Sequence, residues 1–226
     1  MSTVTVTVQD IIVIMDQSGS MHSMGDEPLQ ALNDFILEQQ KSIEDDATFS
    51  FWTFNDKVQL VIDDQPLQSV KKITKYEPGG MTAMHDAIGK AIHTKYRKIK
   101  SNNVVCLIIT DGKENCSQEY TASSIHSLIK EAEEKKNWKF IFLGANQDVF
   151  KEGTKIGFDK KRCAEYIPTC PGALSQLSRD VSTTVARYRS CTQNSSTPQK
   201  VELTLDESSS EDYTLPDPLH LSYDTK

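Results

Sequence analysis

The sequence lacks any apolar run that approaches the roughly 20 residues needed to cross a bilayer. It also lacks the basic start of a secretory signal, since residues 1–16 open with alternating threonine and valine and carry an acid at Asp10. We therefore expect no membrane span and no membrane partner, and we predict that the protein is located in the cytoplasm.

Cysteine is scarce and irregularly spaced. The chain has 226 residues and five cysteines, and no two of them have the Cys-x-x-Cys spacing of a zinc knuckle. An odd number without regular spacing also argues against a disulfide framework, which favours a reducing compartment. The five residues are Cys106, Cys116, Cys163, Cys170 and Cys191.

A stripe of positive charge is missing as well. The net charge is −7, and residues 193–226 account for most of it, because seven acids against two lysines give them −5 and leave −2 for residues 1–192. A near-neutral body without clustered lysine and arginine argues against nucleic acid as a partner, so we predict none.

The same charge distribution divides the chain. We predict that residues 1–192 form one domain and that residues 193–226 form an acidic, disordered C-terminal tail, because the tail is too charged to bury a face. Two alternatives for the tail remain open. Residues 201–205 could add a strand to the sheet, and the serines beside the acids could be phosphorylated.

Apolar patterns indicate strands that alternate with helices. Uninterrupted β-branched runs are typical of strands buried on both faces, and two alternating runs joined at Asn55-Asp56 indicate a hairpin. The predicted fold class is therefore α/β, a Rossmann-like, doubly wound, mainly parallel six-stranded sheet with one antiparallel edge strand and helices on both faces. The expected strands are 3–15, 48–54, 57–62, 104–109, 138–143 and 163–167. The first expected helix begins near Glu27. The later expected helices cover 83–98, 123–136, a short piece near 149–150 and 171–189. Residues 63–78 are expected to form a loop with a single helical turn.

Oxygen-bearing side chains follow two of the buried runs and also a glycine pair at a helix start. They are Asp16, Ser18, Ser20, Thr82 and Asp111. Ligands of open α/β sheets bind beyond the carboxyl ends of the strands, so we expect three loops to present oxygen at one edge of the sheet. Carboxylates and hydroxyls are hard donors that suit Mg²⁺ or Mn²⁺ better than zinc. The alternative is that these residues only turn the chain and cap helices.

The order and spacing of these residues resemble the metal-ion-dependent adhesion site (MIDAS) of von Willebrand factor A domains, in which Asp-x-Ser-x-Ser is followed by Thr and then Asp. All five residues match, and the likeness covers roughly residues 3–192. The segments 81–88, 110–115 and 142–148 look like those of stand-alone intracellular members common in bacteria, some of them linked to tellurite resistance and stress response. The resemblance implies that the five residues hold Mg²⁺ or Mn²⁺ and that an Asp or Glu of a partner protein completes the coordination.

Two other functions remain open for the same site. A hydrolase or phosphate-processing enzyme could use the metal to polarise a phosphate or activate water, and a structural scaffold could use it only to tie loops together. We predict that the protein is not an enzyme. Ser18 lacks the Gly-x-Ser-x-Gly context of a nucleophile. The nearest candidate bases are the lone histidines His22 and His85, and a lone histidine is more often a surface or packing residue than a general base. Two interpretations remain open for Asp86 and Glu114: they either orient the metal ligands or only stabilise a helix start.

Overall fold

The computed structural model describes residues 9–41, 47–99, 103–145, 149–193 and 202–205, which contain a six-stranded sheet in the order β3-β2-β1-β4-β5-β6. The strands are β1 (Gln9–Asp16), β2 (Thr48–Phe54), β3 (Val58–Pro66), β4 (Asn103–Thr110), β5 (Trp138–Ala145) and β6 (Cys163–Tyr166). The α-helices are α1 (Glu27–Gln39), α2 (Met84–Lys98), α3 (Ala122–Lys136), α4 (Val149–Lys155) and α5 (Ala173–Gln193). Short 3₁₀ helices are η1 (Gly19–Met24), η2 (Leu67–Ser69) and η3 (Lys160–Arg162).

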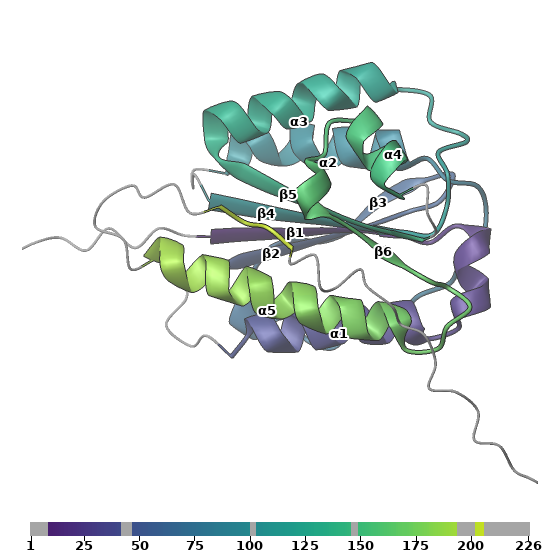
Figure 1. Ribbon diagram of the computed structural model, residues 1–226, viewed down its shortest axis with the longest axis horizontal. Coiled ribbons are helices and arrows are strands. Elements are labelled where there is room, and N and C mark those ends of the chain that lie inside the picture. The colour runs from purple at the N-terminus through teal and green to yellow at the C-terminus, as the bar shows by residue number, and fades with distance from the viewer. Residues whose placement is uncertain (1–8, 42–46, 100–102, 146–148, 194–201, 206–226) are drawn as a thin grey trace, which may run out of the picture.

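Neighbouring strands are parallel except β2 and β3, which form an antiparallel hairpin at one edge. Parallel neighbours need long connections, and the connections between strands contain α1, α2, α3 and α4, while α5 follows β6. Figure 1 shows α1 and α5 on one face and α2, α3 and α4 on the other. The predicted fold class is thus confirmed. Within the described ranges, no helix combines the length and the apolar character that a membrane span requires.

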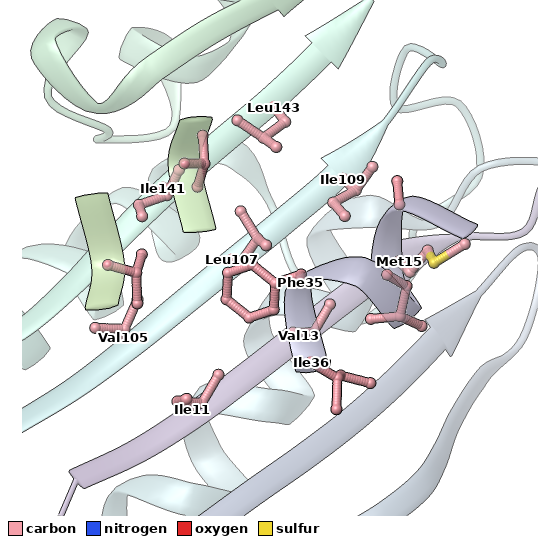
Figure 2. Close-up of a cluster of buried hydrophobic side chains, with 14 of the residues drawn as sticks. Ile11, Val13, Met15, Phe35, Ile36, Val105, Leu107, Ile109, Ile141 and Leu143 are labelled. Carbon is pink, nitrogen blue, oxygen red and sulfur yellow. The ribbon is translucent and has the colours of Figure 1, made fainter. Parts of the chain in front are cut away.

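Strand β1 is central and buried on both faces, because its side chains alternate between two cores. Val13 belongs to the core that also contains Phe35 of α1, as Figure 2 shows. Ile14 belongs to the opposite core, together with Ile88 of α2. Fully burying one such side chain contributes about 1.5–3 kcal/mol, so the two cores hold in place the strand that carries Asp16.

Strand β3 is longer than the sequence pattern indicates. We expected it to end at Ile62, but its pairing with β2 continues to Pro66 through a break in register. At this break Asp64 has a φ of 48°, its N–H donates to Ser50 Oγ at 3.1 Å, and its Oδ1 accepts from buried Lys95 Nζ at 2.6 Å. The predicted end of β3 at Ile62 was wrong. The acids Asp63 and Asp64 interrupt the apolar alternation, and the break in register accommodates them so that the strand continues.

Two predicted stretches lie partly outside the described residues. Residues 3–8 of the expected first strand are among those not described, and so is most of the expected tail. The tail residues 202–205 form no strand, yet Leu203 is 1% exposed in the core beneath α1 and α5. The N–H of Leu205 donates to the carbonyl of Lys161 at 2.9 Å. The division of the chain at residue 192 stays a prediction, but one leucine beyond it is a core residue.

Candidate metal centre

Strands β1 and β4 are parallel neighbours, so their carboxyl ends meet at the same edge of the sheet. Asp16 is the last residue of β1, and Asp111 directly follows β4. The loop that carries Thr82 reaches the same edge, because the N–H of Gly19 donates to the carbonyl of Gly80 at 3.1 Å. The topology therefore brings together the three loops that the sequence predicts.

Asp16 is fully buried, and both of its carboxylate oxygens accept hydrogen bonds. Oδ1 accepts the N–H of Ser18 at 2.7 Å, and Oδ2 accepts the hydroxyl of Thr110 at 2.6 Å. Asp111 Oδ1 accepts the hydroxyl of Ser20 at 2.7 Å, and the Oγ atoms of Ser18 and Ser20 lie 3.1 Å apart. The two acids and the two serines therefore form one connected group, with Asp16 buried at its base and Ser20 exposed at its rim.

Gly112 lies among the predicted residues. A Cβ atom on it would lie 3.1 Å from Thr82 Oγ1, 3.4 Å from Asp16 Oδ2 and 3.5 Å from Ser20 Oγ. Oxygen atoms from two other loops thus surround the space beside Gly112. Any residue larger than glycine at position 112 would fill this space with its side chain. Thr82 is 3% exposed, so its hydroxyl is presented from within the protein. We conclude that all five predicted residues lie around one small region at the sheet edge.

The glycine pair before Thr82 allows the backbone to pass close to its neighbours. Gly80 has a φ of 80°, in the left-handed region, and a Cβ atom there would lie 2.2 Å from Asp56 Oδ1. The N–H of Gly79 donates to the carbonyl of Gln17 at 2.9 Å. Because glycine tolerates both the conformation and the contact, this loop can lie directly against the residues that follow β1.

Three residues that the sequence analysis did not single out support the group. The hydroxyl of Thr110 donates to Asp16. This role could have been predicted, because Thr110 carries a hydroxyl at the end of a buried strand and directly precedes Asp111. The hydroxyl of Tyr76 donates to the main-chain carbonyl of Asp16 at 2.7 Å, and that of Tyr166 donates to the carbonyl of Thr110 at 3.0 Å. No local pattern could have identified the tyrosines, because each comes from a distant part of the sequence.

Burial makes ionisation of the two acids unfavourable. It raises the pKa of Asp16 to about 6, although hydrogen bonds from Thr110 and Ser18 act in the opposite direction. It also raises the pKa of Asp111, with the hydrogen bond from Ser20 lowering it again in part. Negative charge at this edge is therefore incompletely compensated by the protein alone. A cation between the two carboxylates would offset that cost.

The types of donor atom determine which cation suits the group. In the part of the chain that the structure describes, no three His, Cys, Asp or Glu side chains gather as a metal-binding group. The present group instead combines two acids with hydroxyls. Such oxygen donors suit Mg²⁺ and Mn²⁺, and Mg²⁺ keeps several of its waters when it binds proteins. Zinc prefers nitrogen and sulfur. The residues fit a hard divalent cation that retains a coordination place for an outside ligand.

The chain matches a known protein family and is similar to several solved structures. The family model described as von Willebrand factor type A domain matches residues 10–180. No curated protein matches the chain. Among solved structures, the chain is similar to von Willebrand factor type A from Catenulispora acidiphila, with 18% identity and a TM-score of 0.59 over 80% of this chain and 43% of that chain.

Two further solved structures have the same fold. One is proximal thread matrix protein 1 from the mussel byssus with a zinc-occupied MIDAS motif, at 19% identity and a TM-score of 0.59 over 82% of this chain and 48% of that one. The other is the ArnB paralog VWA2 from Sulfolobus acidocaldarius, at 18% identity and a TM-score of 0.55 over 79% and 45%. The chain spans about half the length of these proteins, and identities this low establish a shared fold only.

Proposed function

Because the chain belongs to the von Willebrand factor type A domain family, we propose that it is a metal-dependent protein-binding module. Domains of this family commonly act as metal-dependent protein-interaction modules. In the proposed mechanism, a bound Mg²⁺ or Mn²⁺ coordinates an aspartate or glutamate side chain of a partner protein. The residues proposed to hold the metal are Asp16, Ser18, Ser20, Thr82 and Asp111.

One observation carries this proposal: carboxylate and hydroxyl oxygens from two other loops, those of Asp16 with Ser20 and of Thr82, surround the point where Gly112 has no side chain. Two carboxylates match the two positive charges of the ion, while the three hydroxyls add none. With this charge balance, an ion held by these groups would retain enough positive character to favour an additional carboxylate from outside. Ser20 and Asp111 lie nearest the solvent, so the partner's carboxylate is expected to approach over them.

The surface beside the group supports a protein as the partner. Met81 directly precedes Thr82, and its side chain is 55% exposed. A large apolar side chain at the rim can contact a protein while the metal binds an acid, and methionine is enriched in protein interfaces. We therefore expect the partner's acid to be followed or preceded by an apolar residue.

The identity of the metal is part of the proposal. The mussel protein has zinc in its MIDAS motif, whereas the donors around Gly112 are oxygens. Oxygen donors favour Mg²⁺ or Mn²⁺. Titration with Mg²⁺, Mn²⁺ and Zn²⁺ would rank the three ions by affinity. Any zinc bound among these residues would have oxygen ligands and no histidine or cysteine ligand.

We further propose that the protein works in the cytoplasm and is not an enzyme. Free thiols are usual in a reducing compartment, and the described cysteines Cys106, Cys116, Cys163 and Cys170 are unpaired. The likeness of three segments to stand-alone bacterial members supports a role in stress response. The weak net charge of residues 1–192 supports a protein partner rather than nucleic acid.

Affinity capture tests the proposal. The immobilised protein should retain a partner in Mg²⁺, release it in EDTA and recover it when Mg²⁺ is restored. Thr82→Ala should weaken capture without unfolding the protein, whereas Thr183→Ala, the same change at an exposed position on α5, should not. Replacing the partner's acid by its amide should cost about 2–5 kcal/mol, which turns a micromolar complex into one too weak to capture.

The alternatives give different results. A structural scaffold would be stabilised by the metal without any change in partner affinity. A hydrolase or phosphate-processing enzyme would turn over a small ester or phosphate with a bell-shaped pH dependence and without a stable partner. Capture that persists unchanged in EDTA would place the interface elsewhere and contradict the proposal.

A further inference from the structure

We propose that Asp86 and Glu114 are positioning residues for the metal, because each carboxylate binds backbone of the segment that carries the other and so fixes Thr82 relative to Asp111. This inference rests on the metal-binding function proposed above. It also resolves the two interpretations that the sequence leaves open for these acids, since each one joins two loops instead of serving only its own helix. We call the pair and the contacts between them the carboxylate clamp.

Glu114 uses both oxygens to join its own loop to the start of α2. Oε2 accepts the N–H of His85 at 2.9 Å and the hydroxyl of Ser117 at 2.7 Å. Oε1 accepts the N–H groups of Cys116 at 2.9 Å and Ser117 at 2.7 Å. The first N–H groups of a helix have no partner within it, and Ala83 before α2 offers no side-chain cap. The loop after β4 therefore supplies the missing acceptor.

Asp86 makes the opposite connection, from α2 to the loop. Its Oδ1 accepts the N–H groups of Glu119 and Tyr120, each at 2.9 Å, and its Oδ2 accepts that of Gln118 at 2.9 Å. Its own N–H donates to Ser117 Oγ at 3.1 Å. The hydroxyl of Ser117 thus links the two acids directly, since it also donates to Glu114.

The clamp acts on the residues proposed to bind the metal. Thr82 donates its N–H to Asn115 Oδ1 at 2.8 Å, and its carbonyl accepts the N–H of Asn115 at 3.1 Å. Asn115 follows Glu114 directly, and Asp111 precedes both in the same loop. Moving Thr82 away from Asp111 would therefore break the clamp and this pair of bonds together.

A glycine lets the loop lie this close to the helix. A Cβ atom on Gly89 of α2 would lie 2.4 Å from the ring of Tyr120, far inside contact distance. The ring can therefore pack on the helix, and its hydroxyl lies 2.9 Å from His93 Nδ1. This packing places the N–H of Tyr120 where Asp86 accepts it.

The charge of the two acids is essential to the clamp. Burial raises the pKa of both, but hydrogen bonds from backbone N–H groups outweigh it, so each pKa lies below its ordinary value. The ionised form is therefore the one that the loops bind. Glu114 accepts four hydrogen bonds and Asp86 three. An amide has only one acceptor oxygen, so Gln or Asn would turn an NH₂ group toward N–H donors and leave them unpaired.

The test compares metal affinity with stability in Glu114→Gln, Asp86→Asn and the wild-type protein. Calorimetric titration with Mn²⁺, well below the melting temperature, should show affinity lowered about tenfold or more in each variant, as for other residues that orient metal ligands. Glu131→Gln on α3 is the matched control, because that side chain is 44% exposed, pairs through Oε1 with Lys135 on the surface at 2.9 Å and takes no part in the clamp. The Mn²⁺ affinity of this control should match that of the wild-type protein.

The outcomes separate the inference from the function on which it rests. A merely structural role would lower the melting temperature in EDTA and leave Mn²⁺ affinity unchanged, which would overturn the clamp. A wild-type protein that binds no metal would instead overturn the proposed function and the clamp with it. If an acid variant fails to fold, Ser117→Ala removes the bridging hydroxyl and keeps both charges. We expect this milder variant to fold and to bind Mn²⁺ more weakly than Glu131→Gln does, and equal affinity would again contradict the clamp.

Discussion

Replacing Gly112 by alanine would test the proposed metal site with a single methyl group. The added carbon would lie 3.1 Å from Thr82 Oγ1 and 3.4–3.5 Å from oxygens of Asp16 and Ser20. Gly112 is not among the glycines with a positive φ, so alanine can adopt its backbone conformation. The contact with Thr82 is tighter than usual, but a shift of a few tenths of an ångström relieves it. The substitution therefore changes the space among the donors more than it changes the fold.

The expected magnitude follows from the size of the ion and of the methyl group. Mg²⁺ binds oxygen at about 2.0–2.1 Å, so the ion and a methyl group cannot both occupy the region between these donors. At a hundredfold excess over Kd, metal binding should stabilise the wild type by about 2.7 kcal/mol. For a domain of this size that corresponds to a rise of about 5–11 °C in Tm. Gly112→Ala should show none of this rise.

Thermal unfolding in EDTA, Mg²⁺ and Mn²⁺ measures the effect. In EDTA the variant should melt within a few degrees of the wild type, since restricting the unfolded chain contributes about 0.4–1 kcal/mol and offsets the crowding. Gly79→Ala is the matched control, because a Cβ atom there meets nothing within 4 Å. That control should keep the full rise in Tm. If Gly112→Ala keeps it too, the metal does not bind among these residues.

Three more predictions use other measurements. Asp16→Asn should abolish the rise in Tm with metal, yet in EDTA near neutral pH it should be at least as stable as the wild type, because the amide avoids the burial cost that raises the Asp16 pKa; a clearly less stable variant would contradict this reasoning. Leu203→Ala should lower the free energy of unfolding in urea by about 2–5 kcal/mol, since the side chain is 1% exposed, and an unchanged midpoint would show that it does not pack. In EDTA, the stability lost in Glu114→Gln should be largest near neutral pH and should shrink as the pH falls below 4.5, because a lowered pKa means that the ionised carboxylate stabilises the fold and protonation removes that contribution. A difference that stays constant in acid would refute it.

The sheet was predictable because its central strands are long apolar runs. Runs such as 11–15 and 104–109 are buried on both faces, as is typical of parallel strands covered by helices on each side. The end of β3 was not predictable. Asp64 interrupts the alternation, and its contacts with Ser50 of β2 and Lys95 of α2 explain how the strand continues. Such contacts depend on tertiary structure that local pattern does not contain.

The candidate site shows the same division. Asp16 and Asp111 could be found because strand ends of a parallel sheet meet, which is a consequence of topology alone. The tyrosine that binds the Asp16 carbonyl is 60 positions away, and nothing near Tyr76 distinguishes it from other tyrosines. The roles of Asp86 and Glu114 stayed open for a different reason. Acids near helix starts are common whatever they contact, so their partners must be seen before a role can be assigned.

Composition alone could not predict the core contact that Leu203 makes in the segment after α5. The acids and serines of this segment are typical of a disordered chain, and the strand considered for residues 201–205 does not form in the residues described. A single leucine between polar neighbours is nevertheless enough to reach the core. Average properties of a segment cannot show such a contact, because one buried side chain hardly changes them.

The pairing of distant residues at the site has a consequence for how long the protein stays folded. The hydrogen bond from Ser20 to Asp111 joins residues 91 positions apart, and that from Thr110 to Asp16 joins residues 94 apart. These groups meet only once β1 and β4 have paired, so we expect the proposed ion to bind late in folding, after the rate-limiting step. Interactions absent from the transition state slow unfolding and leave the folding rate almost unchanged. The bound metal would therefore slow unfolding and prolong the lifetime of the native protein, while the folding rate would stay almost the same.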